Sequence, residues 1–294
     1  MDTLIFWLYR FAIWVTPLLP ERFGYGLFAL FGEIAFYLNT GARRAYMKNL
    51  RHVLGADAPP AEYNRITRHA LRNLLKNYFD LFRAHRLTEA QVWAQLESVE
   101  GLEHLDNAVA LGKGVAGGSA QFGNFNMFVC LTALPFKGKH EIIVPVERIK
   151  PENVFALVTK QRATQGIELI PSDQAARTIL KKLRSGAVLG LAIDLDPTHT
   201  GPIVNFFGAP AQLPDGAAAL AVKFHAPLIL GFIRRLDNNK CTVTIEPPLE
   251  LERTGDLAQD TRAAVEKIVA RMEFWIRQYP EQWIMFSPVW QEDK

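Results

Sequence analysis

The chain has 294 residues, of which 49% are hydrophobic and 21% are charged, and its formal net charge is +3. This length and composition exclude extensive disorder and are typical of a compact α/β domain with an N-terminal extension. Residues 1–86 carry twelve Lys or Arg against six Asp or Glu, which indicates an anionic partner, either a membrane or a nucleic acid. A solvated helix face is the plainer alternative.

Two aromatic-rich segments open the chain, at 4–20 (LIFWLYRFAIWVTPLLP) and 23–38 (FGYGLFALFGEIAFYL). An arginine, a glutamate and two prolines interrupt them, so neither offers the roughly 20 apolar residues that a spanning helix needs. A cleaved signal peptide is disfavoured because Asp2 replaces the usual basic start and no small-residue cleavage site follows.

A basic run at 42–51 (ARRAYMKNLR) follows these segments. Apolar aromatic helices followed by arginines suit a protein that lies on an anionic bilayer surface. We therefore expect residues 1–40 to be membrane-associating helices, with ordinary core helices packed on the main domain as the alternative.

The next element is an amphipathic helix over 60–86. Its basic side is predicted to carry Arg65, Arg68, Arg72, Lys76 and Arg83.

Beyond residue 88, short apolar runs alternate with helical patterns. Strands are predicted at 114–119, 141–146, 166–170, 187–194, 227–233 and 241–245. Helices are predicted near 101–111, 123–134, 151–165, 173–184, 214–225 and 257–279. This alternation predicts an α/β fold with a central, mostly parallel or mixed sheet flanked by helices, forming a single domain over 41–294.

Two predicted strand ends are unusual. One is GGSAQFGNFN at 117–126, where small residues lead from a strand into a helix, and the other ends in Asp194 and Asp196. Binding sites in open α/β sheets gather at the carboxyl ends of strands, so both are candidate site segments.

The segment at 117–126 resembles the signature of the lysophospholipid-acyltransferase-like superfamily, in the branch of the lipid A biosynthesis and phosphatidylinositol mannoside acyltransferases. That branch has His-Phe-Gly-Asn-Trp-Glu or a close variant here, a histidine and an acid separated by four residues. The residues that match are Phe122, Gly123, Asn124 and the aromatic Phe125. Gln121 and Asn126 stand in the two catalytic places.

Further blocks extend the resemblance over most of the chain. They lie at 43–50, 162–166, 194–196, 206–216 and 279–283. The Arg-rich tail common in lipid A enzymes is replaced by Phe-Ser-Pro-Val-Trp at 286–290, which, with the Asp-x-Asp form at 194–196, favours the mannoside-type relatives.

The resemblance implies a membrane-associated acyltransferase. Such an enzyme moves a fatty acyl group from acyl-CoA or acyl carrier protein to a hydroxyl of a glycolipid or phospholipid at the cytoplasmic face of the membrane, with neither a metal nor a redox cofactor. The family histidine is the general base and the acid orients it. It also implies substrate-binding roles for Gly123, Asn124, Arg162, Asp194 and Asp196.

Gln121 and Asn126 keep roughly the size and hydrogen-bonding reach of a His and Asp pair, but neither side chain titrates near neutral pH. The chain is therefore predicted to be catalytically impaired, and two such losses favour deliberate inactivation over drift. A natural lipid-binding pseudoenzyme, or an enzyme that uses another base, is the competing interpretation. His199 on a predicted loop is the best substitute base.

Other interpretations remain open at this point. Ser119, Asp194 and His225 occur in α/β-hydrolase order, although the last glycine of G-x-S-x-G is missing. Nucleic-acid binding is suggested by the basic helix, but the aromatic N-terminus suits a bilayer better.

Cys130 and Cys241 show no metal-ligand spacing and are expected to be buried free thiols. An acyl groove is expected to be lined by Phe122, Phe125, Phe206 and Phe207.

Overall fold

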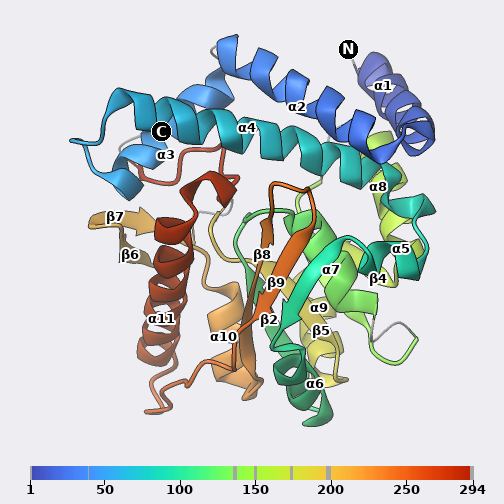
Figure 1. The fold of residues 1–294 in the computed structure, drawn as a ribbon. Coiled ribbons are helices and arrows are strands. Elements are labelled where there is room, and N and C mark those ends of the chain that lie inside the picture. Colours follow the sequence, from blue (N-terminus) through green and yellow to red (C-terminus); the bar gives the residue numbers. More distant parts are fainter. Residues whose placement is uncertain are drawn as a thin grey trace.

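A computed structural model describes residues 2–38, 40–134, 138–148, 151–172, 175–196 and 200–291. Four helices come first, and Figure 1 shows the last of them lying across one end of a sheet, with the first two outside it. They are α1 (Asp2–Val15), α2 (Glu21–Tyr37), α3 (Gly41–Leu54) and α4 (Pro60–Arg83). A short helix, α5 (Glu89–Trp93), leads from them into the sheet.

The sheet has seven strands in the order β1-β9-β8-β2-β5-β3-β4. Within the described residues every neighbouring pair runs parallel except β8–β9. The strands are β1 (Leu96–Glu100), β2 (Val115–Ser119), β3 (Ile142–Val146), β4 (Ile167–Pro171), β5 (Val188–Ala192), β8 (Leu228–Arg235) and β9 (Cys241–Ile245). The prediction of a mostly parallel sheet flanked by helices is confirmed.

Right-handed crossovers divide the helices between the two faces of the sheet. One face carries α6 (Leu102–Ala110), α7 (Phe125–Ala133) and α8 (Glu152–Thr164), and the other carries α9 (Ala175–Arg184), α10 (Gly216–Phe224) and α11 (Leu257–Gln278). The neighbouring strands β2 and β5 lead to opposite faces. The topological switch point, where open α/β sheets bind ligands, therefore lies between their carboxyl ends.

The predicted elements omitted the short helix α5, the strand β1 and a hairpin of β6 (Ile203–Phe206) and β7 (Ala209–Gln212). The hairpin turn consists of Phe207 and Gly208, which both have positive φ, 50° and 82°. Two residues of positive φ form the type I′ turn that fits the twist of a hairpin. The resemblance indicated a turn at Phe206-Phe207-Gly208, but phenylalanine is unusual at a type I′ position, so the two strands of a hairpin were not predicted.

Helix α2 packs along α4 through one face and leaves its other face open. The helices approach closely at Gly32, where a Cβ would lie only 2.7 Å from the Arg72 Cα. At the predicted basic side of α4, Arg83 is buried rather than solvated, because it pairs with Asp80 and Glu21. No helix in the described part of the chain combines the length and the apolar character needed to cross a bilayer.

The segment 285–290 returns to the N-terminal helices. Asn49 Nδ2 donates to the carbonyls of Met285 (3.0 Å) and Ser287 (2.8 Å), and Asn49 is fully buried. Trp290 stacks on Phe206 with ring centroids 5.2 Å apart. The segment 43–50 therefore holds the C-terminal segment against the sheet domain.

Candidate active site

The loop after β2 is joined to the loop after β5 by one carboxylate. Asp194 Oδ2 accepts hydrogen bonds from the Gln121 backbone N–H (2.8 Å) and from Trp283 Nε1 (2.9 Å). Burial raises the pKa of Asp194 to about 6, although these two donors act in the opposite direction. Its Oδ1 is buried without a hydrogen-bond partner among the described residues. Asp194 thus fixes the backbone at residue 121. Its charged carboxylate is destabilised by burial.

The segment 279–283 is the backbone partner of the loop. Gly123 N–H donates to the Gln282 carbonyl (2.6 Å), and Ile284 N–H donates to the Gln121 carbonyl (2.7 Å). Gly123 has φ +53°, and a Cβ there would lie 1.8 Å from the Ile233 carbonyl oxygen, so only glycine fits. These contacts explain why the two sequence blocks occur together.

Asn124 is the N-cap of α7. Its side-chain oxygen accepts from Met127 N–H (3.3 Å), and its Nδ2 donates to Asp80 Oδ2 (2.8 Å). The capping role therefore belongs to Asn124, and Gln121 and Asn126 cap no described helix.

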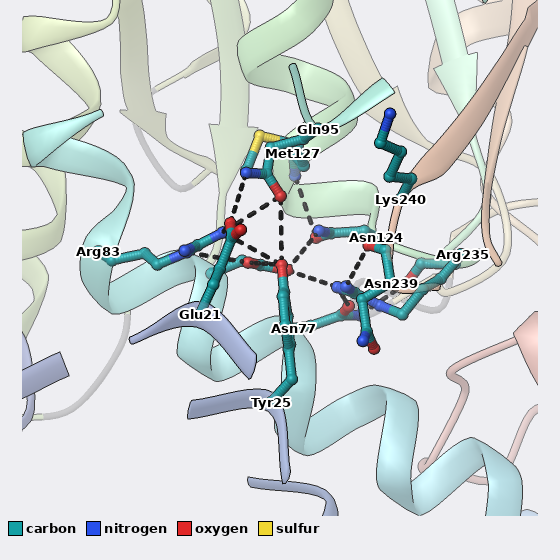
Figure 2. Close-up of polar contacts among 12 residues, drawn as sticks. Glu21, Tyr25, Asn77, Arg83, Gln95, Asn124, Met127, Arg235, Asn239 and Lys240 are labelled. Carbon is teal, nitrogen blue, oxygen red and sulfur yellow. Dashed lines mark hydrogen bonds and ion pairs between the residues drawn. The ribbon is translucent and has the colours of Figure 1, made fainter. Parts of the chain in front are cut away.

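A buried polar cluster lies behind this loop, which we name the Asp80 cluster: Tyr25, Asn77, Asp80, Arg83, Asn124 and Arg235. Figure 2 shows side chains from α2, α4, the loop and the end of β8 converging. Asp80 contacts Arg235 at 2.5 Å, the Tyr25 hydroxyl at 2.7 Å and Arg83 at 3.3 Å. Asn77 bonds Arg235 and also donates to the Gly123 carbonyl at 2.7 Å.

Every charge in the Asp80 cluster has an opposite partner. Burial alone would lower the pKa of Arg235, but the adjacent Asp80 carboxylate raises it above its ordinary value. The sequence alone did not predict this cluster. The sequence shows only an aspartate, Asp80, inside the apolar face of α4 and an arginine, Arg235, at the end of an apolar strand. Neither position predicts that the two side chains meet.

Asn126 points to Arg162. Arg162 Nη2 donates to Asn126 Oδ1 (2.7 Å), and Nη1 donates to the Asn126 carbonyl (3.1 Å) and contacts Cys130 Sγ (2.9 Å). Arg162 is only 7% exposed, so a carboxylate at position 126 would form a buried ion pair with it. Both cysteines are buried and free, as predicted, and burial raises the pKa of Cys130 despite the opposing Arg162 charge.

A cavity of about 620 Å³ opens beside Gln121. Its wall includes Phe125, whereas Phe122, Phe206 and Phe207 are packed in the core, so those three predictions of a groove-lining role are wrong. Phe206 stacks on Trp290, and Phe122 and Phe207 make edge-to-face contacts with neighbouring aromatic rings. The local sequence does not distinguish such core aromatic residues from the wall of a groove.

The predicted substrate-binding residues occupy two kinds of position. Asp196 lines the cavity and accepts from Gly201 N–H at 2.8 Å. Gly123, Asn124, Arg162 and Asp194 are buried behind the cavity wall, where they hold the loop.

The serine hydrolase triad does not assemble. Ser119 lies at the carboxyl end of β2, whereas His225 is exposed at the end of α10, before the amino end of β8. The register pairs Gly118 with Leu230, so the two residues are separated by about six positions of extended chain, roughly 20 Å. His199 lies outside the described residues, and the described residues contain no group of three potential metal ligands.

Comparison with known proteins identifies a family and relatives from two bacterial species. The sequence model of the family described as bacterial lipid A biosynthesis acyltransferase matches residues 1–292. A phosphatidylinositol mannoside acyltransferase of Mycobacterium tuberculosis (strain ATCC 25618 / H37Rv) is 28% identical over 264 residues, covering 88% of this chain and 80% of that protein. The enzyme of that name from Mycolicibacterium smegmatis (strain ATCC 700084 / mc(2)155) is 25% identical over 283 residues, covering 94% and 88%.

Proposed function

Since the chain belongs to the family of bacterial lipid A biosynthesis acyltransferases, whose activity is acyl transfer, we propose a specific form of that reaction. The fold moves a fatty acyl group from acyl-CoA or acyl carrier protein to a hydroxyl of a glycolipid or phospholipid. In this chain the reaction is impaired, because the catalytic pair is replaced by Gln121 and Asn126.

The supporting observation is the position of the cavity. It opens at Gln121, the place of the family histidine, and its volume of about 620 Å³ lies within the range of pockets that hold small ligands. Apolar side chains of α7 line it, and an acyl chain bound among them would place its thioester carbonyl at the cavity mouth.

The chemistry requires a base at this mouth. As the acceptor oxygen attacks the thioester carbonyl, a base takes the hydroxyl proton, the C–O bond forms, the C–S bond breaks and the thiol leaves with a proton. The Gln121 amide cannot take that proton near neutral pH. The Asn126 amide accepts from Arg162 but lacks the negative charge that would orient a histidinium.

A glycolipid acceptor suits the polar part of the mouth. Asp196, Thr200 and Asp215 line it together, and carboxylate and hydroxyl oxygens accept hydrogen bonds from sugar hydroxyls. The relatives named as phosphatidylinositol mannoside acyltransferases support the same class of acceptor.

Peripheral attachment to the cytoplasmic face of the membrane, through residues 1–40, is supported by an exposed apolar surface on α1 and α2. Trp7 (57% exposed), Phe11 and Trp14 (60% exposed) lie at helical spacing on one face of α1, and Arg10 and Arg22 are exposed nearby. Monomeric soluble proteins rarely leave such a contiguous patch open to water.

Liposome co-sedimentation tests this attachment. Trp7→Ala/Trp14→Ala is expected to weaken binding to phosphatidylglycerol vesicles at least tenfold, because each buried indole contributes roughly 1.5–3 kcal/mol. Phe274→Ala, which removes a 46% exposed ring from α11, is the matched control and should leave binding unchanged. Equal binding of the double variant and the unmodified chain would contradict membrane attachment through α1.

Restoring the catalytic pair tests the activity. Gln121→His/Asn126→Asp is expected to transfer palmitoyl from palmitoyl-CoA or palmitoyl carrier protein to a mannosylated phosphatidylinositol at least roughly 100-fold faster than the unmodified chain. Gln259→His/Asn238→Asp makes the same replacements at exposed positions and should gain nothing. An inactive but folded Gln121→His/Asn126→Asp protein that still binds lipid would favour a non-catalytic lipid-binding protein instead.

A further inference from the structure

The cavity beside Gln121 reaches both faces of the sheet. Val129 and Thr132 on α7 line it, and so do Ile179 on α9 and Leu220 on α10. Helices α7 and α10 lie on opposite faces, so one cavity joins two lobes across the carboxyl edge of β2 and β5. We name them the α7 lobe and the α10 lobe.

The strand register separates the two lobes. Gly117 and Gly190 are paired neighbours on β2 and β5, and without side chains they leave room against the sheet on the α7 side. The alternate positions of β5, Leu189 and Leu191, point to the α10 side, because successive side chains of a strand face opposite ways. Each lobe therefore borders a different face of the sheet.

The two lobes differ in the polarity of the side chains that line them. The α7 lobe ends among the apolar side chains of Leu105, Ile142 and Ile229. The α10 lobe has the half-buried Leu191 and Leu220 inside, and Asp196 and Asp215 where the cavity opens. Apolar walls below a polar rim suit a lipid whose head group carries hydroxyls.

We propose that the two lobes bind two hydrocarbon chains at once: the α7 lobe holds the acyl chain to be transferred, and the α10 lobe holds a chain of the acceptor lipid. This inference rests on the proposed acyltransferase function. The acceptor head group would then lie between Asp196 and Gln121, with its hydroxyl at the mouth where the thioester carbonyl of the donor is placed.

The number of bound chains tests the proposal without any catalysis. Native mass spectrometry with palmitate as probe is expected to show two palmitates on the unmodified protein, one on Leu220→Trp, one on Val129→Trp, and none in either lobe of the double variant. Residual binding to the double variant measures adsorption on the exposed surface of α1 and α2. Leu257→Trp, at a 46% exposed position of α11, is the matched control and should retain both palmitates.

Three results would overturn the proposal. A single palmitate on the unmodified protein, unaffected by Leu220→Trp, would leave the acyltransferase function standing and remove the second chain site. Loss of both palmitates in each folded single variant would indicate one continuous site. No bound palmitate at all would contradict the proposed function as well.

Photolabelling gives a second measurement that requires no substitution. Palmitate with a terminal diazirine should label peptides from both α7 and α10 of the unmodified protein. Labels confined to α7 would also overturn the proposal.

Discussion

The ends of the loop after β2 and its middle are held in different ways. At the ends, Gln121 lies at the cavity mouth and Asn126 bonds Arg162, and neither side chain titrates near neutral pH. In the middle, the Gly123 carbonyl accepts from Asn77, and Asn124 donates to Asp80 within the Asp80 cluster, in which every charge is paired. The groups that position this loop are therefore separate from the side chain that faces the cavity at 121. The geometry of the loop does not depend on which side chain stands at that position.

Breaking the Asp80 cluster should have the largest effect. Arg235→Leu leaves the buried Asp80 without its nearest cation, and we expect a loss of about 3–5 kcal/mol in the free energy of unfolding by urea titration. Lys240→Leu removes a 47% exposed cation that pairs with Glu97, and it should change that free energy by less than about 1 kcal/mol. Similar effects of the two variants would show that the cluster does not hold the loop.

Asp194 gives a pH-dependent effect of intermediate size. Its pKa of about 6 lies above the value of an exposed aspartate, so the native state binds more protons than the unfolded state between about pH 4 and 6. Its contribution is therefore fully present below about pH 4 and is lost as pH rises through 6, a difference of about 3 kcal/mol.

Unfolding measured across this range isolates that contribution. The stability of the unmodified chain relative to Asp194→Asn should fall between pH 4 and 7, because asparagine does not titrate. A difference that stays constant, or that grows with pH, would mean that the buried carboxyl is not destabilised by its surroundings.

The smallest effect is expected at the helix cap. Asn124→Ala removes the cap of α7 and one bond to Asp80, and we expect a loss of about 1–2 kcal/mol in the free energy of unfolding. Asp256→Ala removes the cap of α11, whose exposed carboxylate accepts from the N–H groups of Ala258 and Gln259 and bonds no buried charged side chain among the described residues, and it should cost about 1 kcal/mol or less. An equal or greater loss for Asp256→Ala would mean that Asn124 serves only as a cap.

Much of the sheet could be predicted because buried parallel strands are short apolar runs between helical patterns, as at 114–119 and 187–194. The Asp80 cluster could not be predicted, because Asp80 and Arg235 are brought together only by the tertiary fold, which places α4 across the end of the sheet where β8 ends (Figure 1). The fate of Phe206 was equally unpredictable, since a core aromatic and a groove aromatic have the same local pattern. Gln121 and Asn126 were assigned to the catalytic places by resemblance to the family. Their inability to take up a proton near neutral pH follows from the amide groups of the side chains.

The claim that the chain is impaired with Gln121 and Asn126 in place is tested most directly by measuring the thiol released when the unmodified protein is mixed with palmitoyl-CoA and acceptor lipid. We expect the thioester to bind and remain intact, with thiol release no faster than without protein. Release at about 1 s⁻¹ or faster, accompanied by acylated lipid, would contradict the claim, because typical enzymes turn over at that rate with a functioning base.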